Sequence, residues 1–199
     1  LYIDASTLEG MRIKHIVDSL SNKKLIQPLL IVGIHANKEE DYGIANLTGE
    51  EQTGTKAGKF NEFIREELYP FIKKKATIRK FKSIAICGTG ISGISALDIA
   101  WQNADKIDRL GIFSGNFNYA KNKSDSINAV LNEIQSSRKR PKLQYWIYAA
   151  NNPSEEIYQR STDLINIINK KNIGSSTDIQ FVTNNTEKNN IDAWRHHFP

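Results

Sequence analysis

Residues 84–97 read Ile-Ala-Ile-Cys-Gly-Thr-Gly-Ile-Ser-Gly-Ile-Ser-Ala-Leu. The apolar run at 83–87 predicts a buried strand, and the glycines at 88 and 90 predict a turn directly after it. Apolar residues at helical spacing then predict a helix over 91–101. Two kinds of site use a strand, a glycine-rich turn and a helix in this order. One binds the pyrophosphate of a dinucleotide at the helix N-terminus, and the other exposes a nucleophilic serine above the sheet.

The dinucleotide interpretation fits the spacing but not its context. Gly88, Gly90 and Gly93 match the G-x-G-x-x-G pattern. That pattern normally lies near the start of the sheet, and an acidic residue follows at the end of the next strand. Here two predicted strands come first, and the next strand ends in Phe113-Ser114-Gly115 without an acid. We therefore expect no cofactor.

Strand and helix patterns alternate along the whole chain. Predicted strands cover residues 1–4, 28–34, 83–87, 110–113, 143–149 and 177–182, and predicted helices cover residues 11–20, 60–72, 91–101, 125–136, 155–170 and 192–198. This alternation predicts a single α/β domain over residues 1–199, with a mostly parallel sheet between two layers of helices. In such sheets ligands bind beyond the carboxyl ends of the strands, so the residues that follow strands carry the functional information.

Composition excludes several classes of site and partner. The chain has 199 residues, a formal net charge of +5 and one cysteine, which excludes an internal disulfide and a zinc site with two thiolates. No run reaches the roughly 18 apolar residues of a membrane helix. Basic clusters at 73–82 and 138–142 precede predicted strands, so we assign them to helix ends. We expect no metal, nucleic acid or membrane partner.

The first residue, Leu1, already lies in a predicted strand. We therefore expect the sequence to be a crop that lacks one or two N-terminal strands of its sheet. Because a signal peptide would precede such a crop, no compartment is assigned.

Several motifs resemble one family from end to end. They include Asp41-Tyr42-Gly43, Phe113-Ser114-Gly115 and the terminal Asn189-Asn190 followed by Trp194-Arg195. In these motifs, and in residues 1–4, 28–34, 57–72 and 88–97, the sequence resembles the α/β-hydrolase family named "putative esterase", which includes esterase D-like proteins, enterochelin esterases and some feruloyl esterases. The resemblance implies an α/β-hydrolase fold and a serine, histidine and acid that hydrolyse esters.

The same resemblance implies that this chain has lost the catalytic residues. The family's nucleophilic serine falls on Gly90, and its histidine falls on Asn189. The acid should follow the strand that ends at 149, where the chain has Ala150-Asn151-Asn152-Pro153. Glycine has no oxygen to attack an ester, and an asparagine amide is not a base near neutral pH.

We therefore expect an inactive esterase homologue that acts as a binding or accessory domain for a small molecule, such as an ester or a glycoside. The predicted ligand cleft comprises Asp4, Ala5, Asp41, Tyr42, Ile91 and Asn151. The backbone N–H of Ile91 would point to the former oxyanion position. Two alternatives stay open: an active carboxylic-ester hydrolase rebuilt around Ser92 with His35 as its base, and a structural module that presents its sheet to a partner. The sequence assigns no oligomeric state.

Overall fold

Six short strands form one parallel sheet in the part of the chain that the structure describes. This computed structural model describes residues 1–47, 53–119, 128–152, 156–171, 178–185 and 188–198, so the predictions for Pro153 and for the helix start at 125–127 lie outside it. The strands are β1 (Tyr2–Ile3), β2 (Gly33–Ile34), β3 (Ala85–Thr89), β4 (Arg109–Phe113), β5 (Gln144–Tyr148) and β6 (Ile179–Val182). Their order is β2-β1-β3-β4-β5-β6, and every pair is parallel.

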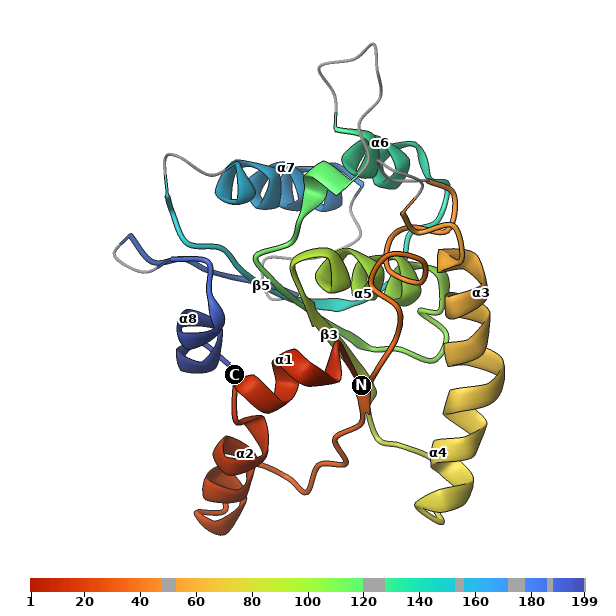
Figure 1. The fold of residues 1–199 in the computed structure, drawn as a ribbon, viewed down its shortest axis with the longest axis vertical. Helices are drawn as coiled ribbons and strands as arrows, with labels where there is room; N and C mark the ends of the chain where they lie inside the picture. Colours follow the sequence, from red (N-terminus) through yellow and green to blue (C-terminus); the bar gives the residue numbers. More distant parts are fainter. Residues whose placement is uncertain (48–52, 120–127, 153–155, 172–177, 186–187, 199) are drawn as a thin grey trace.

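Helices cover both faces of the sheet (Figure 1). They are α1 (Ala5–Gly10), α2 (Ile13–Asn22), α3 (Ala57–Glu62), the π-helical η2 (Phe63–Leu68), α4 (Tyr69–Lys75), α5 (Gly90–Gln102), the 3-10 turn η3 (Phe117–Tyr119), α6 (Ala129–Ser136), α7 (Ile157–Lys170) and α8 (Ile191–His196). The α/β fold with a helix-flanked parallel sheet is thus confirmed. Among the described residues, no helix is long and apolar enough to span a membrane.

The two hydrophobic clusters follow the alternation of side chains along the strands. Ile112 and Ile147 join the cluster that holds α3, α5, α6 and α7. Their neighbours Phe113 and Tyr148 join the second cluster, which holds Met11 and the helices α2 and α8. Successive strand residues point to opposite faces, so each strand contributes to both clusters. The sheet is therefore buried on both sides, as its nearly continuous apolar strands require.

The strand order places a topological switch point between β1 and β3. The chain passes from β1 to one side to form β2, and then returns to the other side to form β3 and the later strands. Ligand sites in open α/β sheets lie at the carboxyl ends of the strands at such a point. Asp4 follows β1 and Gly90 follows β3, so both residues lie at this position.

One predicted strand is mostly absent, and one predicted helix is shifted by two residues. The predicted buried strand over 28–34 is reduced to Gly33–Ile34, and Leu29 and Leu30 are 60% and 51% exposed. Among the described residues β2 pairs only with the two-residue β1, so the preceding apolar residues have no ladder to join. The helix predicted over 11–20 is α2, displaced to Ile13–Asn22, and the sequence analysis missed α1 before it.

Candidate functional site

The turn at Gly90 joins β3 to α5 without an intervening loop. Gly90 has a φ of +54°, a left-handed conformation that side chains other than glycine adopt only with strain. A Cβ added at Gly90 would meet no atom within 4 Å, whereas a Cβ at Gly88 would lie 2.2 Å from the carbonyl oxygen of Ser92. Gly88 therefore lets the strand approach the helix, and Gly90 leaves open space at the place where a side chain would project.

The hydroxyl of Ser92 is bound within this turn. Ser92 is 1% exposed, and its Oγ donates to the carbonyl of Thr89 at 2.8 Å and accepts from the Thr89 N–H at 2.9 Å. Thr89 accepts from the Ser92 backbone in return, which completes a capping box at the start of α5. His35 is exposed after β2, and β1 lies between β2 and β3, so His35 follows a strand roughly 10 Å from the strand that precedes Gly90.

Asn189 and Ser114 join three segments beyond the carboxyl ends of β4 and β5. The hydroxyl of Ser114 donates to Asn189 Oδ1 at 2.6 Å, and the N–H of Ala150 donates to the same oxygen at 2.9 Å. Ser114 in turn accepts from the indole N–H of Trp194 at 2.9 Å. Ser114 is buried and has a φ of +50°, so the loop after β4 holds it in a strained backbone conformation. The side-chain oxygen of Asn189 acts here as an acceptor for two donors.

Asp4 lies beside this turn because β1 pairs with β3 at Tyr2 and Cys87. It has a φ of +76°, and its carboxylate caps α1 through the N–H of Thr7 and accepts from the hydroxyl of Ser6. Lys38 forms an ion pair with Asp4 at 2.9 Å. Burial alone would raise the pKa of Asp4, but the contacts with Ser6, Lys38 and Thr7 outweigh it and hold the pKa below the ordinary value.

The remaining residues of the predicted cleft differ in accessibility. Ala5 is buried in the first turn of α1, and Tyr42 is 1% exposed with its ring 6.0 Å from that of Phe60. Burial and the nearby charge of Asp4 raise the pKa of Tyr42 to about 12. Asp41 accepts from the N–H of Asn37 at 2.9 Å, and the exposed Asn151 donates to Asn185 at 3.0 Å.

Two side chains of α5 anchor the loop that contains Tyr42. The N–H of Gly43 donates to Ser95 Oγ at 2.7 Å, and the N–H of Ala45 donates to Asp98 Oδ2 at 3.1 Å. Asp98 is 3% exposed, and its burial raises its pKa despite the hydrogen bonds that favour the charged form. Among the residues that the structure describes, no cation forms an ion pair with Asp98.

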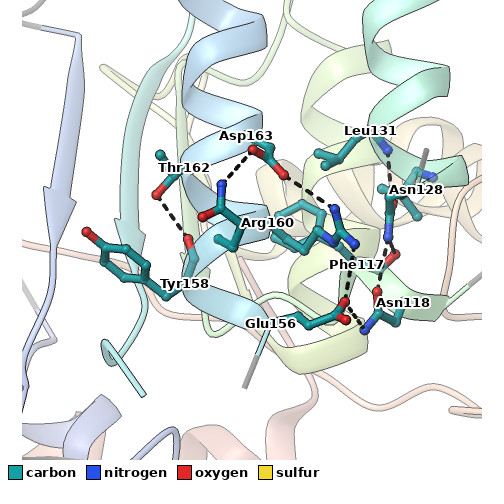
Figure 2. A network of polar contacts seen from close by, with 11 residues as sticks. Phe117, Asn118, Asn128, Leu131, Glu156, Tyr158, Arg160, Thr162 and Asp163 are labelled. Carbon is teal, nitrogen blue, oxygen red and sulfur yellow. Dashed lines mark hydrogen bonds and ion pairs between the residues drawn. The ribbon is translucent and has the colours of Figure 1, made fainter. Parts of the chain in front are cut away.

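A second network fixes η3, the turn that follows β4, to α6 and α7 (Figure 2). Asn128 caps α6 through the N–H groups of Val130 and Leu131, and it donates to the carbonyl of Phe117 at 2.6 Å. Asn118 donates to Glu156 at 3.2 Å, and Arg160 pairs with the same carboxylate at 3.3 Å. The loop that begins with Ser114 is therefore held at two places. Asn189 and Trp194 bind it at Ser114, and the contacts of α6 and α7 hold it at η3.

The sequence of this chain matches the model of a known family described as "Putative esterase" over residues 1–199. The chain belongs to this esterase family. The assignment agrees with the position of Gly90 on a strand-to-helix turn and with the α/β fold around it. Among curated proteins, no match was found.

Solved structures of esterases share the fold of this family member. The enterochelin esterase from Shigella flexneri superposes with a TM-score of 0.74 at 14% identity, covering 98% of this chain and 47% of its own. A ferulic acid esterase superposes with a TM-score of 0.71 at 12% identity, covering 98% of this chain and 79% of its own. The enterobactin esterase FES from Shigella flexneri, solved in the presence of 2,3-di-hydroxy-N-benzoyl-serine, has a TM-score of 0.74 at 16% identity. The chain spans about half the length of these enterobactin esterases.

The sequence analysis missed two features of this esterase-family site. One is the central position of Ser114, for which the Phe-Ser-Gly motif was the available signal. The other is Lys38, whose pairing with Asp4 had no signal in the sequence pattern. The indole of Trp194 takes part in the same contacts, because it donates to Ser114. Among the described residues, no three His, Cys, Asp or Glu side chains group as a metal site.

Proposed function

We propose that this chain is a non-catalytic binding domain of the esterase family, which retains the cleft but not the hydrolytic residues. The observation that carries the proposal is Gly90 in the turn between β3 and α5, which we call the elbow. Gly90 has the left-handed conformation there, at the position where the resemblance places the family's nucleophilic serine. Glycine keeps the shape of this turn at no conformational cost, but it supplies no attacking oxygen.

The position of the histidine supports the same conclusion. Asn189 occupies it, and the two donors on its Oδ1 stabilise an amide acceptor rather than a proton-accepting base. Ser92 is an unsuitable substitute nucleophile, because its hydroxyl is buried and satisfies both backbone groups of Thr89. Removing that hydroxyl from the cap would cost roughly 1 kcal/mol before any chemistry began.

The ligand of this cleft is a small molecule with an ester or related carbonyl group. Ile91 lies in the first turn of α5, where backbone N–H groups have no partner within the helix. In the elbow geometry this N–H lies beside the former oxyanion position, so it suits a carbonyl oxygen. The enterobactin esterase FES from Shigella flexneri, which shares this fold, was solved in the presence of enterobactin, and this supports an ester as the ligand class.

Two measurements test the proposal. Treatment with a fluorophosphonate probe and assays on short acyl nitrophenyl esters should give neither labelling nor hydrolysis. Covalent labelling that disappears in Ser92→Ala would overturn the proposal and establish the rebuilt active site.

The binding role is tested separately with phenyl butyrate in titration calorimetry. Ile91→Pro removes the N–H at a first-turn position where proline is tolerated, and Ile91→Ala is the matched control that keeps it. We expect Ile91→Pro to bind about tenfold more weakly than Ile91→Ala, in line with one lost hydrogen bond. Equal affinities for the two variants would exclude the Ile91 N–H as the ligand donor.

A further inference from the structure

The exposed apolar side chains of the molecule concentrate at one end, far from the candidate cleft in the fold. Of the six large hydrophobic side chains that are exposed among the described residues, five lie in segments 22–34 and 70–84: Leu25, Leu29, Leu30, Ile31 and Phe71. The five exposed side chains precede β2 and β3 in the chain, so they lie toward the amino ends of the strands, whereas Gly90 lies at a carboxyl end.

The same two segments account for the net positive charge of the chain. They contain eight of the 27 Lys and Arg residues and none of the 22 Asp and Glu residues. The rest of the chain therefore holds 19 basic and 22 acidic residues, and the net charge of +5 arises entirely from these segments. We call the surface formed by residues 22–34 and 70–84 the cationic apolar surface.

The two segments are neighbours in space. Lys82 donates to the side chain of Gln27 at 3.3 Å, which joins the segment after α4 to the segment after α2. Figure 1 shows the end of α2, the coil that leads to β2 and the end of α4 at the same lower end of the molecule. The ammonium group of Lys75 lies over the exposed ring of Phe71 at 5.7 Å, so charge and apolar surface are also mixed within α4.

We propose that the cationic apolar surface docks onto an anionic lipid bilayer. Exposed leucine and phenylalanine beside lysine are typical of segments that insert shallowly at the headgroup boundary while cations contact acidic headgroups. The prediction that the chain has no membrane partner rested on the absence of a spanning segment, and a peripheral contact needs none.

The charge and composition of the surface favour this occupant over other macromolecules. A second copy of the chain would place two acid-free cationic segments against each other, which is electrostatically unfavourable. Protein interfaces are enriched in tyrosine, tryptophan and arginine and depleted in lysine, whereas seven of the eight cations here are lysine. Single-stranded nucleic acids are bound on several aromatic side chains, whereas four of the five exposed large hydrophobic side chains here are aliphatic.

The experiment measures co-sedimentation of the chain with vesicles of phosphatidylcholine, with and without phosphatidylserine. The test variant combines Lys24→Gln, Lys80→Gln and Lys82→Gln. The control removes the same charge from exposed lysines elsewhere, by Lys142→Gln, Lys170→Gln and Lys188→Gln. A second test variant combines Leu29→Ser and Leu30→Ser, which are exposed and so leave the fold intact.

We expect binding to the phosphatidylserine vesicles that weakens with added salt. Loss of about fivefold per lysine predicts about 100-fold weaker binding for the first test variant, and little change for the control. The double leucine variant should also bind more weakly than the parent chain. Equal binding by the test and control variants, or no preference for phosphatidylserine, would overturn the proposal. So would a concentration-dependent dimer that the double leucine variant abolishes, because that would identify a second copy as the occupant.

Discussion

The hydroxyl of Ser114 donates a 2.6 Å hydrogen bond to the side-chain oxygen of Asn189, 75 residues later in the chain. Because Trp194 also donates to Ser114, one hydroxyl connects the end of β4 to the segment before α8 and to α8 itself. Asn189, which the sequence resemblance assigns to the family's histidine position, is therefore held by a structural hydrogen bond.

This arrangement predicts that Ser114→Ala is destabilising. The substitution removes the acceptor of the Trp194 indole and one donor to Asn189, so we expect a loss of about 1–3 kcal/mol in the free energy of unfolding. Urea denaturation measures it. Ser136→Ala is the control, because Ser136 is exposed and bonds only its own helix, and it should change stability by less than about 0.5 kcal/mol. Equal effects of the two substitutions would contradict a central role for Ser114.

Gly90→Ser alone should restore no esterase activity. A Cβ at this position meets no atom within 4 Å, so the substitution should cost only about 1–2 kcal/mol through the positive φ. With Asn189 unable to accept its proton, the new hydroxyl stays a poor nucleophile.

Assays on short acyl nitrophenyl esters check this second prediction. Gly90→Ala controls for the backbone strain, and any hydrolysis that is gained should need both Gly90→Ser and Asn189→His. Measurable turnover by Gly90→Ser alone would refute the placement of the histidine position at Asn189.

Asp98 should make the folded protein less stable as the pH rises, which is opposite to the usual effect of a carboxylate. Burial raises its pKa in the folded state, so the folded protein holds this proton more tightly than the unfolded chain does. The contribution to stability is therefore fully present below the ordinary pKa of about 4, and is lost as the pH rises through the raised value.

The variant Asp98→Asn isolates this effect. Its amide stays neutral at every pH, so its stability relative to the parent chain should increase as the pH rises from about 4 towards neutrality. Thermal unfolding of both proteins across this range measures the difference. A constant difference would show that folding leaves the pKa of Asp98 unchanged, and a difference of opposite sign would show that folding lowers it; either result would contradict the prediction.

Asn128 should contribute to stability in two separable ways. Its side-chain oxygen caps α6, and its side-chain N–H₂ donates to the carbonyl of Phe117 at 2.6 Å. Asn128→Ala loses both contacts and should cost about 2 kcal/mol.

Asn128→Ser keeps a capping oxygen but not the donor, so we expect about half of that loss. Denaturant titrations of the two variants give the comparison. If Asn128→Ser were as unstable as Asn128→Ala, the cap would contribute nothing measurable.

The strand–turn–helix at the elbow was predictable because its signals are local. Glycine spacing and the apolar run fix β3, the turn and α5 within a few residues of one another. The strand at 28–34 failed because a strand needs a partner, and the apolar character of Leu29 and Leu30 does not reveal whether a neighbouring strand reaches them.

The site was predictable to a smaller degree. The resemblance placed Gly90 and Asn189 in the family pattern, and their proposed roles stay predictions. The bonds from Ser114 and from Lys38 join residues that are distant in the sequence or lie in an irregular loop, where periodicity carries no information. Tyr42 is largely buried, which its position in a loop did not indicate.

The contact of Arg195 with α1 has a consequence for the order of folding. Arg195 donates to the carbonyl oxygens of Gly10 and Met11, and the latter contact spans 184 residues of sequence. Contacts of such separation carry a large loop-closure entropy and form late. We therefore expect α8 to dock last, and the face it shares with α1 and α2 to open before the rest of the sheet does. Amide hydrogens on that face should exchange earlier than those of β3 and β4.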